Sequence, residues 1–320
     1  MHSRDYYLDL IHDAINALRF PREPQGLYDP ITYALDCGGK RLRPMLTLAA
    51  AEACGLDPQL AVNQALAVEI FHNFTLLHDD VMDRADVRRG RPTVHMKWDD
   101  NTAILSGDAM LTYATIILAE NAAECLPQLL AMFNKTAMEV YEGQQYDMDF
   151  ESRQDVTVNE YINMISLKTS VLLGCACALG AIRAQAHPQN VEALYKFGHM
   201  LGLAFQLRDD WLDTFGDTAM FGKAIGGDIL NGKKTWLLIN ALERDESGEV
   251  KKWLAVNDMP PERIAAVTAA YRRLGLDTEC QTEIDSYIDR AIAALSAASL
   301  PHDAKEFFTN LAEATRSRNN

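Results

Sequence analysis

The sequence has no excess of positive charge. Its 320 residues include 30 Lys and Arg against 45 Asp and Glu, which gives a formal net charge of −15. Nucleic-acid binding needs a basic surface, and this chain can supply one only locally, so we exclude nucleic acid as a general partner. An acidic excess is easiest to explain where carboxylates hold cations.

Cysteines are few and lack the spacing of zinc ligands, which indicates a reducing cytoplasm. Cys175 and Cys177 are two residues apart, would lie on different sides of a helix, and are interpreted as small core residues. The first 20 residues lack a continuous apolar signal core. No uninterrupted apolar run reaches about 18 residues, so we expect no transmembrane segment.

Alternating runs of β-branched residues are also missing, whereas helical periodicity is present almost throughout. The sequence therefore predicts an all-α fold. A loop is expected over 218–235 and a tail of shorter amphipathic helices after 245. No linker or low-complexity tract separates two domains, so we predict one domain over 1–320. Helices are expected at about 6–18, 41–54, 58–83, 101–120, 126–150, 157–183 and 188–214.

One predicted helix carries three acids within the stretch "HDDVMD". Asp79 and Asp83 are one turn apart and Asp80 is the next residue around, so the three carboxylates share one flank and repel each other. A single triplet of this kind is typical of a solvated helix surface. A positive partner is needed if the helix is buried.

The same pattern returns as "RDDWLD", with Asp209, Asp210 and Asp213. Both copies lie in apolar sequence, where unpaired carboxylates would cost several kcal/mol each. Two such arcs facing one cavity would form a clamp for hard divalent cations. Mg²⁺ prefers one or two carboxylates together with water and phosphate oxygens. The two triplets therefore favour a metal site for a phosphorylated substrate over a solvated surface.

Basic residues that could bind phosphate lie near both triplets, and Arg and Lys are the usual protein groups for phosphate oxygens. Three of them, Arg41, Arg91 and Lys234, are expected to be ordinary solvated charges. Gly227 to Lys233 spells G-x-x-x-x-G-K, but Lys follows and no strand precedes it, so we reject a nucleotide-binding P-loop. The basic stretches are "GGKRLRP" (38–44), "RRGRP" (88–92) and "GKAIGGDILNGKK" (222–234).

Taken together and in order, these motifs resemble the trans-isoprenyl diphosphate synthases, or polyprenyl synthetases. The resemblance covers nearly the whole chain and includes "GQQYDM" (143–148) and "SLKTS" (166–170). It implies a bundle of long helices around a central cavity and a homodimer. It also implies head-to-tail (1′-4) condensation of isopentenyl diphosphate with an allylic diphosphate, with Mg²⁺ as cofactor and three ions bound.

The resemblance also implies roles for individual residues. Asp79, Asp83 and Asp209 would ligate Mg²⁺, supported by Asp80, Asp210 and Asp213. The allylic diphosphate would be held by Arg88, Lys168 and Lys223, and the isopentenyl diphosphate by Lys40, Arg43, His72 and Arg89. Thr169 and Gln206 would line the reacting centre, and Lys233 would bind substrate. His78 is interpreted as structural, and Tyr146 and Asp147 either extend a metal–water network or pack the helix.

Product length is expected to depend on the helix of the first triplet. Phe74 lies about 7.5 Å and Phe71 about 12 Å before Asp79 along the helix axis, and Thr75 leaves the other side open. In the family, an aromatic residue at the fifth position before the first Asp alone suggests geranylgeranyl diphosphate. Farnesyl diphosphate is close behind.

Two other functions remain open at this point. A class I terpene cyclase also uses an Asp-rich helix and Mg²⁺, but it would not need "GGKRLRP". A non-catalytic subunit of a heteromeric synthase would have the same fold. Such subunits usually lack one triplet or part of the stretch "GKAIGGDILNGKK" (222–234), here called the Lys loop. Catalytic prenyl transfer is the prediction that uses all six motifs.

Overall fold

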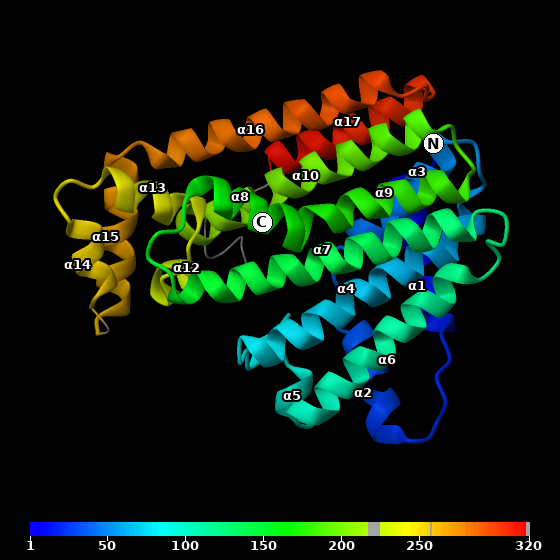
Figure 1. Ribbon diagram of the computed structural model, residues 1–320, viewed down its shortest axis with the longest axis horizontal. Helices are drawn as coiled ribbons and strands as arrows, with labels where there is room; N and C mark the ends of the chain where they lie inside the picture. Colours follow the sequence, from blue (N-terminus) through cyan, green and yellow to red (C-terminus); the bar gives the residue numbers. More distant parts are fainter. Residues whose placement is uncertain (217–224, 257, 318–320) are drawn as a thin grey trace. The chain divides into compact units, whose positions relative to one another are not determined.

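The computed structural model describes residues 1–216, 225–256 and 258–317. These residues are almost entirely helical, as the ribbon in Figure 1 shows, and the predicted all-α fold is confirmed. The chain forms two compact units. Unit 1 is Met1–Asn134 with Cys175–Leu194, and unit 2 is Lys135–Gly174 with Tyr195–Asn320. The single domain over 1–320 stays a prediction.

Unit 1 is organised around α4 (Val62–Met82), which packs against α3 (Leu42–Ala53), α6 (Asp100–Ala119) and α1 (Arg4–Ala17). Small residues let these helices approach closely. A Cβ at Gly180 would lie 2.1 Å from the backbone oxygen of Thr47 in α3. The other elements of unit 1 are α2 (Gln25–Leu35), η1 (Pro58–Ala61), α5 (Val94–Lys97) and the first part of α7 (Leu126–Ser152).

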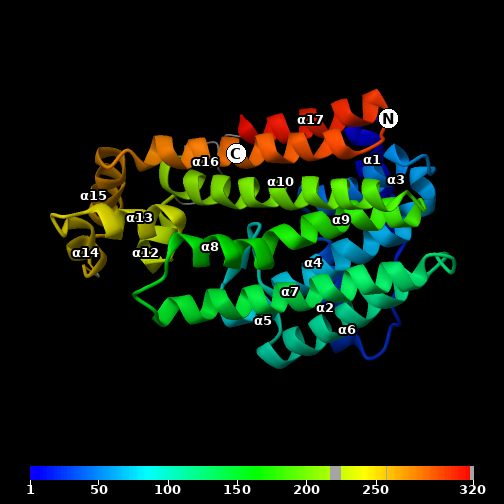
Figure 2. The same ribbon diagram turned by 45° about the horizontal axis from the view of Figure 1, so that its top comes forward.

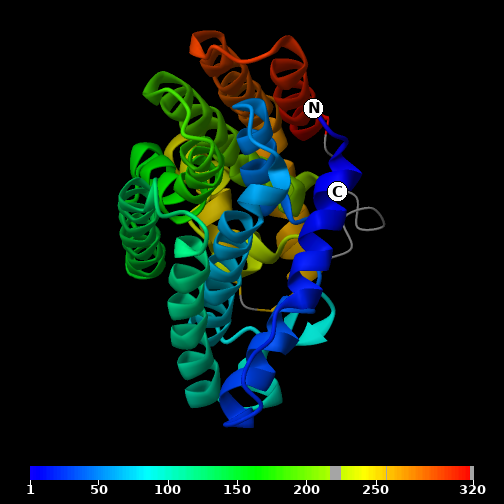
Figure 3. The ribbon, with the colours of Figure 1, turned by 90° about the vertical axis from the view of Figure 1, so that its right-hand side faces the viewer.

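A two-stranded hairpin follows the first triplet and is drawn as a cyan arrow in Figure 3. Strand β1 (Val87–Arg88) pairs antiparallel with β2 (Arg91–Pro92), with Arg88 opposite Arg91. Arg89 and Gly90 between them both have positive φ, 52° and 74°. Two residues with positive φ are the requirement of the type I′ turn that favours tight hairpins. This hairpin was not predicted from the sequence.

Unit 2 contains the rest of α7 and the remaining helices, except that residues 175–183 of α9 and 188–194 of α10 belong to unit 1. Helices α16 (Leu276–Ala294) and α17 (His302–Arg316) lie side by side, as Figures 1 and 2 show in orange and red. Within this unit α16 also contacts α13 and α15. The other elements are α8 (Val158–Ile165), η2 (Ser166–Ser170), α9 (Val171–Arg183), α10 (Pro188–Phe215), α12 (Gly227–Asn231), α13 (Trp236–Arg244), α14 (Glu249–Leu254), α15 (Pro260–Arg273) and η3 (Leu295–Ala297).

Most predicted helices agree with the structure to within a few residues, and three details differ. The expected loop 218–235 contains α12, a short helix that begins after Gly226 (φ 88°) and ends before Gly232 (φ 61°). The expected tail of short helices includes α16, which has 19 residues. The predicted 157–183 helix is present but contains one π-helical turn, η2.

Cys175, Cys177 and the long hydrophobic helices contribute to the apolar core. Cys175 and Cys177 are fully buried, which fits their interpretation as small core residues. Two stretches, Asp100–Ala119 and Val158–Arg183, are long and apolar enough to cross a membrane. This is weak support for a span, because buried core helices pass the same test, and 72% of the second window is buried.

Candidate active site

The first triplet lies at the end of α4 in unit 1. Asp80 is only 4% exposed, whereas Asp79 is half-buried and Asp83 exposed. Arg88 from the hairpin donates from Nε to both Asp80 oxygens, at 2.8 and 2.9 Å, and its Nη2 lies 2.6 Å from Oδ1. The middle carboxylate is therefore neutralised by the protein, and the flanking carboxylates are the more accessible ones.

The hairpin sends its two neighbouring arginines to different places. Arg88 reaches back to the triplet, whereas Arg89 donates to the Gly38 carbonyl of "GGKRLRP" and its guanidinium lies 2.9 Å from where a Cβ at Gly39 would be. Gly39 therefore leaves room for Arg89. The hairpin is tied down by Thr93, whose hydroxyl donates to the Ala85 carbonyl at 2.7 Å. Backbone strain at Arg89 is the local cost of this arrangement.

The loop before α3 is held by a buried ion pair. Arg41 has φ 48° and is 6% exposed, and its Nη1 contacts Glu69 of α4. Its Nη2 donates to the Leu35 carbonyl at 2.6 Å, and Asn73 donates to Glu69 Oε1 at 3.0 Å. The prediction that Arg41 is a solvated charge is wrong, because its carboxylate partner lies 28 residues away in sequence. Lys40 beside it is exposed.

His72 lies beside Arg43, with 3.2 Å between His72 Nε2 and Arg43 Nη1. Desolvation lowers the pKa of His72 well below its usual value, and the charges of Arg43, Arg89, Arg88 and Arg41 act in the same direction. The imidazole is therefore neutral. Arginine can only donate, so Nε2 accepts and the proton is on Nδ1. His72 can offer that N–H to an anion, and four arginine charges lie near it.

Aromatic residues fill α4 before the triplet. Phe71 and Phe74 are buried, and their ring centroids are 5.5 Å apart. Phe133 packs on Phe71, with 5.3 Å between the ring centroids. Thr75 is half-buried and donates to the His72 carbonyl at 2.9 Å. His78 contacts Phe74 and donates from Nε2 to the Ile104 carbonyl at 3.0 Å, in agreement with a structural role.

The second triplet lies on α10 in unit 2. As in the first triplet, the middle carboxylate is buried and accepts hydrogen bonds from the protein, but the donors are different. Asp210 is 4% exposed, whereas Asp209 and Asp213 are half-buried. The hydroxyl of Tyr161 donates to Asp210 Oδ2, and the Gln206 amide donates to Oδ1 at 3.0 Å. Burial raises the pKa of Asp210 and the like charge of Asp209 adds to the rise, whereas the charge of Lys233 and the two hydrogen bonds oppose it. Tyr161 was missed, because nothing in "VNEYINMI" separates it from an ordinary apolar-face residue.

The "SLKTS" motif is the π turn η2, and glycines let it pack tightly in unit 2. A Cβ at Gly143 would lie 2.2 Å from the Lys168 backbone nitrogen, and one at Gly202 would lie 2.6 Å from Ser170 Cα. Lys168 Nζ lies 2.5 Å from Asp147 Oδ2. Thr169 donates to Gln206 Oε1 at 3.1 Å. Gly143 and Asp147 of "GQQYDM" thus position and pair the lysine of the π turn. π turns often mark functional sites.

The end of the Lys loop adds one more acid. Asp228 was not predicted as a site residue, yet its backbone N–H donates to Asp213 Oδ2 at 2.9 Å. Burial raises its pKa to about 7, and Asp210, Asp213 and Asp147 add to the rise. Lys233 lies 4.0 Å from Asp228 and opposes it. The sequence signal that could have identified Asp228 was the presence of an acid among the glycines and lysines of "GGDILNGKK". Lys223 lies outside the described residues.

Known proteins similar to this chain identify its family. The polyprenyl synthetase family model matches residues 24–274. The chain belongs to the polyprenyl synthetase family. A geranylgeranyl diphosphate synthase of Methanosarcina mazei is 44% identical over 233 residues, or 72% of each chain. A crystal structure of a geranylgeranyl pyrophosphate synthase covers 100% of both chains with TM-score 0.96 and 44% identity. The synthetase of Pyrococcus horikoshii has TM-score 0.92 and 32% identity, covering 98% and 97%.

The donor set of this polyprenyl synthetase fits Mg²⁺. In the described part of the chain no three His, Cys, Asp or Glu side chains gather closely enough to form a protein cage for a metal. Mg²⁺ seldom uses such a cage, because it keeps waters and takes substrate phosphate oxygens. The less buried carboxylates of both triplets offer hard oxygen ligands of that kind, whereas Asp80 and Asp210 are each only 4% exposed.

The predicted site residues fall into two groups. Unit 1 brings together Lys40, Arg43, His72, Arg88, Arg89 and the first triplet, and unit 2 brings together Lys168, Thr169, Gln206, Lys233 and the second triplet. Their ligands and roles stay predictions. Arg91 and Lys234 are not part of either group's described contacts with the triplets. Arg91 lies over the Tyr33 ring at 4.1 Å, and Lys234 donates to the Gly232 carbonyl at 3.3 Å.

Glu69→Gln should lower the free energy of unfolding by about 3–5 kcal/mol, because it leaves the buried Arg41 charge without its carboxylate. Urea unfolding measures this. The double variant Arg41→Met with Glu69→Leu removes both charges and should recover most of the loss. A single variant as stable as the wild type would contradict the buried pair.

Gly143→Ala should lower the free energy of unfolding by about 1–3 kcal/mol, since the added methyl meets the backbone of the π turn. Gly26→Ala is the matched control, because a Cβ there has nothing within 4 Å. We expect the control to be neutral or slightly stabilising in the same urea titration. Equal effects of the two substitutions would refute the close packing at Gly143.

Proposed function

We propose that this chain is a prenyltransferase that condenses isopentenyl diphosphate head-to-tail (1′-4) with allylic diphosphates in a Mg²⁺-dependent reaction. The product is a short all-trans prenyl diphosphate, chiefly geranylgeranyl diphosphate, with farnesyl diphosphate as the second candidate. The observation that carries the proposal is the pair of triplets, each with its middle carboxylate held by protein donors and its flanking carboxylates more accessible. Residues 1–320 act as one functional domain.

The two groups of residues suit the two diphosphates. Lys40, Arg43, His72 and Arg89 bind the diphosphate of isopentenyl diphosphate, as the arginine charges around neutral His72 support. The allylic diphosphate is assigned to Arg88, Lys168 and Lys223, and Lys233 also binds substrate. Asp79, Asp83 and Asp209 bind Mg²⁺, and Asp80, Asp210 and Asp213 support them. Three bound Mg²⁺ ions supply the positive charge that stabilises the departing diphosphate.

The reaction also develops a positive charge on carbon, and Thr169 and Gln206 stabilise that charge. Thr169 uses its proton on Gln206 Oε1, so its oxygen lone pairs stay available. Oxygen dipoles fixed before the reaction stabilise such charge without reorganisation. The Lys168–Asp147 contact and the π turn keep Thr169 in place. The released diphosphate itself can take the proton, so no side-chain general base is required.

We further propose a cytoplasmic homodimer. Helix α6 exposes three large apolar side chains, Ile104 at 43%, Leu105 at 59% and Ile116 at 51%. Several large apolar side chains exposed on one helix indicate a surface that another protein covers. A second copy of this chain is the occupant that the family resemblance implies. Light scattering after gel filtration tests the assembly, and a monomer at micromolar concentration would reject it.

The activity is tested by incubating the protein and Mg²⁺ with isopentenyl diphosphate and, in parallel, dimethylallyl, geranyl and farnesyl diphosphates. Mass spectrometry of the hydrolysed products should show elongation that ends at the geranylgeranyl or farnesyl length. Asp79→Ala should reduce turnover about a hundredfold or more, as removal of one preorganised electrostatic group typically does. Asp9→Ala, an exposed acid of α1, is the control.

Each other result of that incubation has its own meaning. A cyclic hydrocarbon would replace the proposal by a terpene cyclase. A lack of condensation with every primer would favour a non-catalytic subunit of a heteromeric synthase. Near-normal turnover of Asp79→Ala would reject the metal assignment of the first triplet.

Phe74→Ala should shift the product distribution to longer chains, because Phe74 is the buried aromatic closest to the triplet on α4. The same products are sized by mass spectrometry. Phe20→Ala removes an aromatic side chain that packs on Tyr113 instead, so it controls for general loosening of unit 1. An unchanged product length in the Phe74 variant would mean that another wall limits elongation.

A further inference from the structure

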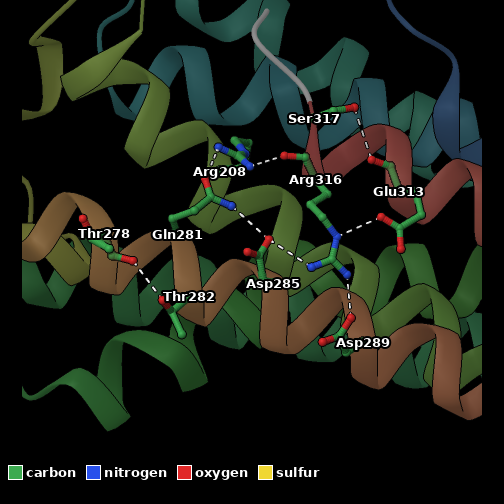
Figure 4. A network of polar contacts seen from close by, with 9 residues as sticks. All are labelled: Arg208, Thr278, Gln281, Thr282, Asp285, Asp289, Glu313, Arg316 and Ser317. Carbon is green, nitrogen blue, oxygen red and sulfur yellow. Dashed lines mark hydrogen bonds and ion pairs between the residues drawn. The ribbon is translucent and has the colours of Figure 1, made fainter.

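Arg208 directly precedes the second triplet, and its side chain is turned into unit 2. It is 4% exposed. Figure 4 shows its two terminal nitrogens reaching different helices: Nη1 donates to Gln281 Oε1 of α16 at 2.6 Å, and Nη2 donates to the backbone carbonyl of Arg316 at the end of α17. Its guanidinium carbon also lies 5.3 Å from the centroid of the Trp211 ring, one turn along α10.

Arg316 holds that carbonyl in place through its own side chain. Its Nη2 lies 2.5 Å from Asp289 and its Nη1 lies 3.3 Å from Asp285, both on α16. Its Nε donates to Glu313 at 2.8 Å. Gln281 in turn donates to Asp285 Oδ1 at 2.9 Å, so the network closes on itself (Figure 4). The last described turn of α17 is thus fastened to α16 and presents one carbonyl to Arg208.

This network restricts the rotation of α10 at the triplet. The planar guanidinium satisfies two acceptors from two helices only at one position, because its donors form a rigid fork. Asp209 is the next residue, so a rotation of α10 that freed Arg208 would also turn the Asp209 and Asp213 carboxylates. Trp211 is fixed by a second contact, from its Nε1 to the Asp277 carbonyl at 3.0 Å. The side of α10 opposite the buried Asp210 contacts is therefore anchored as well.

We propose that Arg208 is a positioning residue that couples the last turn of α17 to the second aspartate triplet and sets the direction in which Asp209 and Asp213 present their carboxylates to Mg²⁺-bound diphosphate. The proposal rests on the proposed function of that triplet. It assigns a role to Arg316 and Gln281, which the reaction itself does not require. Partners one contact behind metal ligands typically change metal affinity about 10- to 100-fold when they are removed.

Calorimetry of Mg²⁺ with inorganic diphosphate tests the coupling in the full chain without turnover. Arg208→Gln should weaken Mg²⁺-dependent diphosphate binding about tenfold or more. Arg316→Ala keeps the backbone carbonyl but loosens it, so its effect should be smaller and in the same direction. The double variant should be no worse than Arg208→Gln alone, since coupled residues are not additive. Arg208→Lys keeps the charge but loses the fork and should restore binding only in part.

Arg273→Ala is the matched control, because it removes an Arg–Glu ion pair between α15 and α14 that has no described link to the triplet. Thermal unfolding checks that each variant is folded. Steady-state kinetics should show a raised KM for the allylic diphosphate with little change in the KM for isopentenyl diphosphate, a split that general destabilisation would not produce.

Two sets of results would overturn the coupling: folded Arg208→Gln and Arg316→Ala that bind like the wild type, or an equal loss in Arg273→Ala. A wild type that binds Mg²⁺ and diphosphate but makes no product would reject the proposed activity and still leave the coupling tested. A wild type that binds neither would overturn both.

Discussion

Repulsion between carboxylates on one helical arc is the constraint to which the rest of the site responds. Three acids at i, i+1 and i+4 cannot all be buried as charges, because unpaired buried carboxylates cost several kcal/mol each. In both triplets the middle Asp is buried and is bonded by protein donors, Arg88 for Asp80 and Tyr161 with Gln206 for Asp210. The flanking acids stay closer to solvent. The same sequence pattern thus leads to the same arrangement with two different sets of donors.

Two unusual backbone conformations, the hairpin turn after Arg88 and the π turn η2, place charged and polar side chains beside the triplets. Arg88 can turn to the triplet while Arg89 turns to the Gly38 carbonyl because Arg89 and Gly90 form a tight turn with two positive φ angles after Arg88. The π turn holds Lys168 and Thr169 next to Asp147 and Gln206, and it fits only where Gly143 and Gly202 leave room. The positive φ angles of Arg41 and Arg89 thus place backbone strain beside the charged groups of unit 1, where the surrounding packing can hold it.

The sequence predicted what depends on local pattern and missed what depends on distant partners. Apolar periodicity located the long helices, and the charge patterns located both triplets and the basic stretches. The π turn and the two-residue strands are too short to leave a periodic signal. Arg41 was misjudged because Glu69 is far away in sequence, and Tyr161 was missed because its hydroxyl partner, Asp210, is 49 residues away. Asp228 lay inside a stretch that was interpreted for its lysines alone.

The balance of charge also separates the two groups of residues. In unit 1, Lys40, Arg41, Arg43, Arg88 and Arg89 stand against Glu69 and the first triplet, so the acids are largely balanced before any ligand binds. In unit 2, among the described residues of the site, Asp147, Asp228 and the second triplet stand against Lys168 and Lys233. The raised pKa values of Asp210 and Asp228 reflect burial together with this crowding of acids. A bound cation relieves more repulsion in unit 2 than in unit 1.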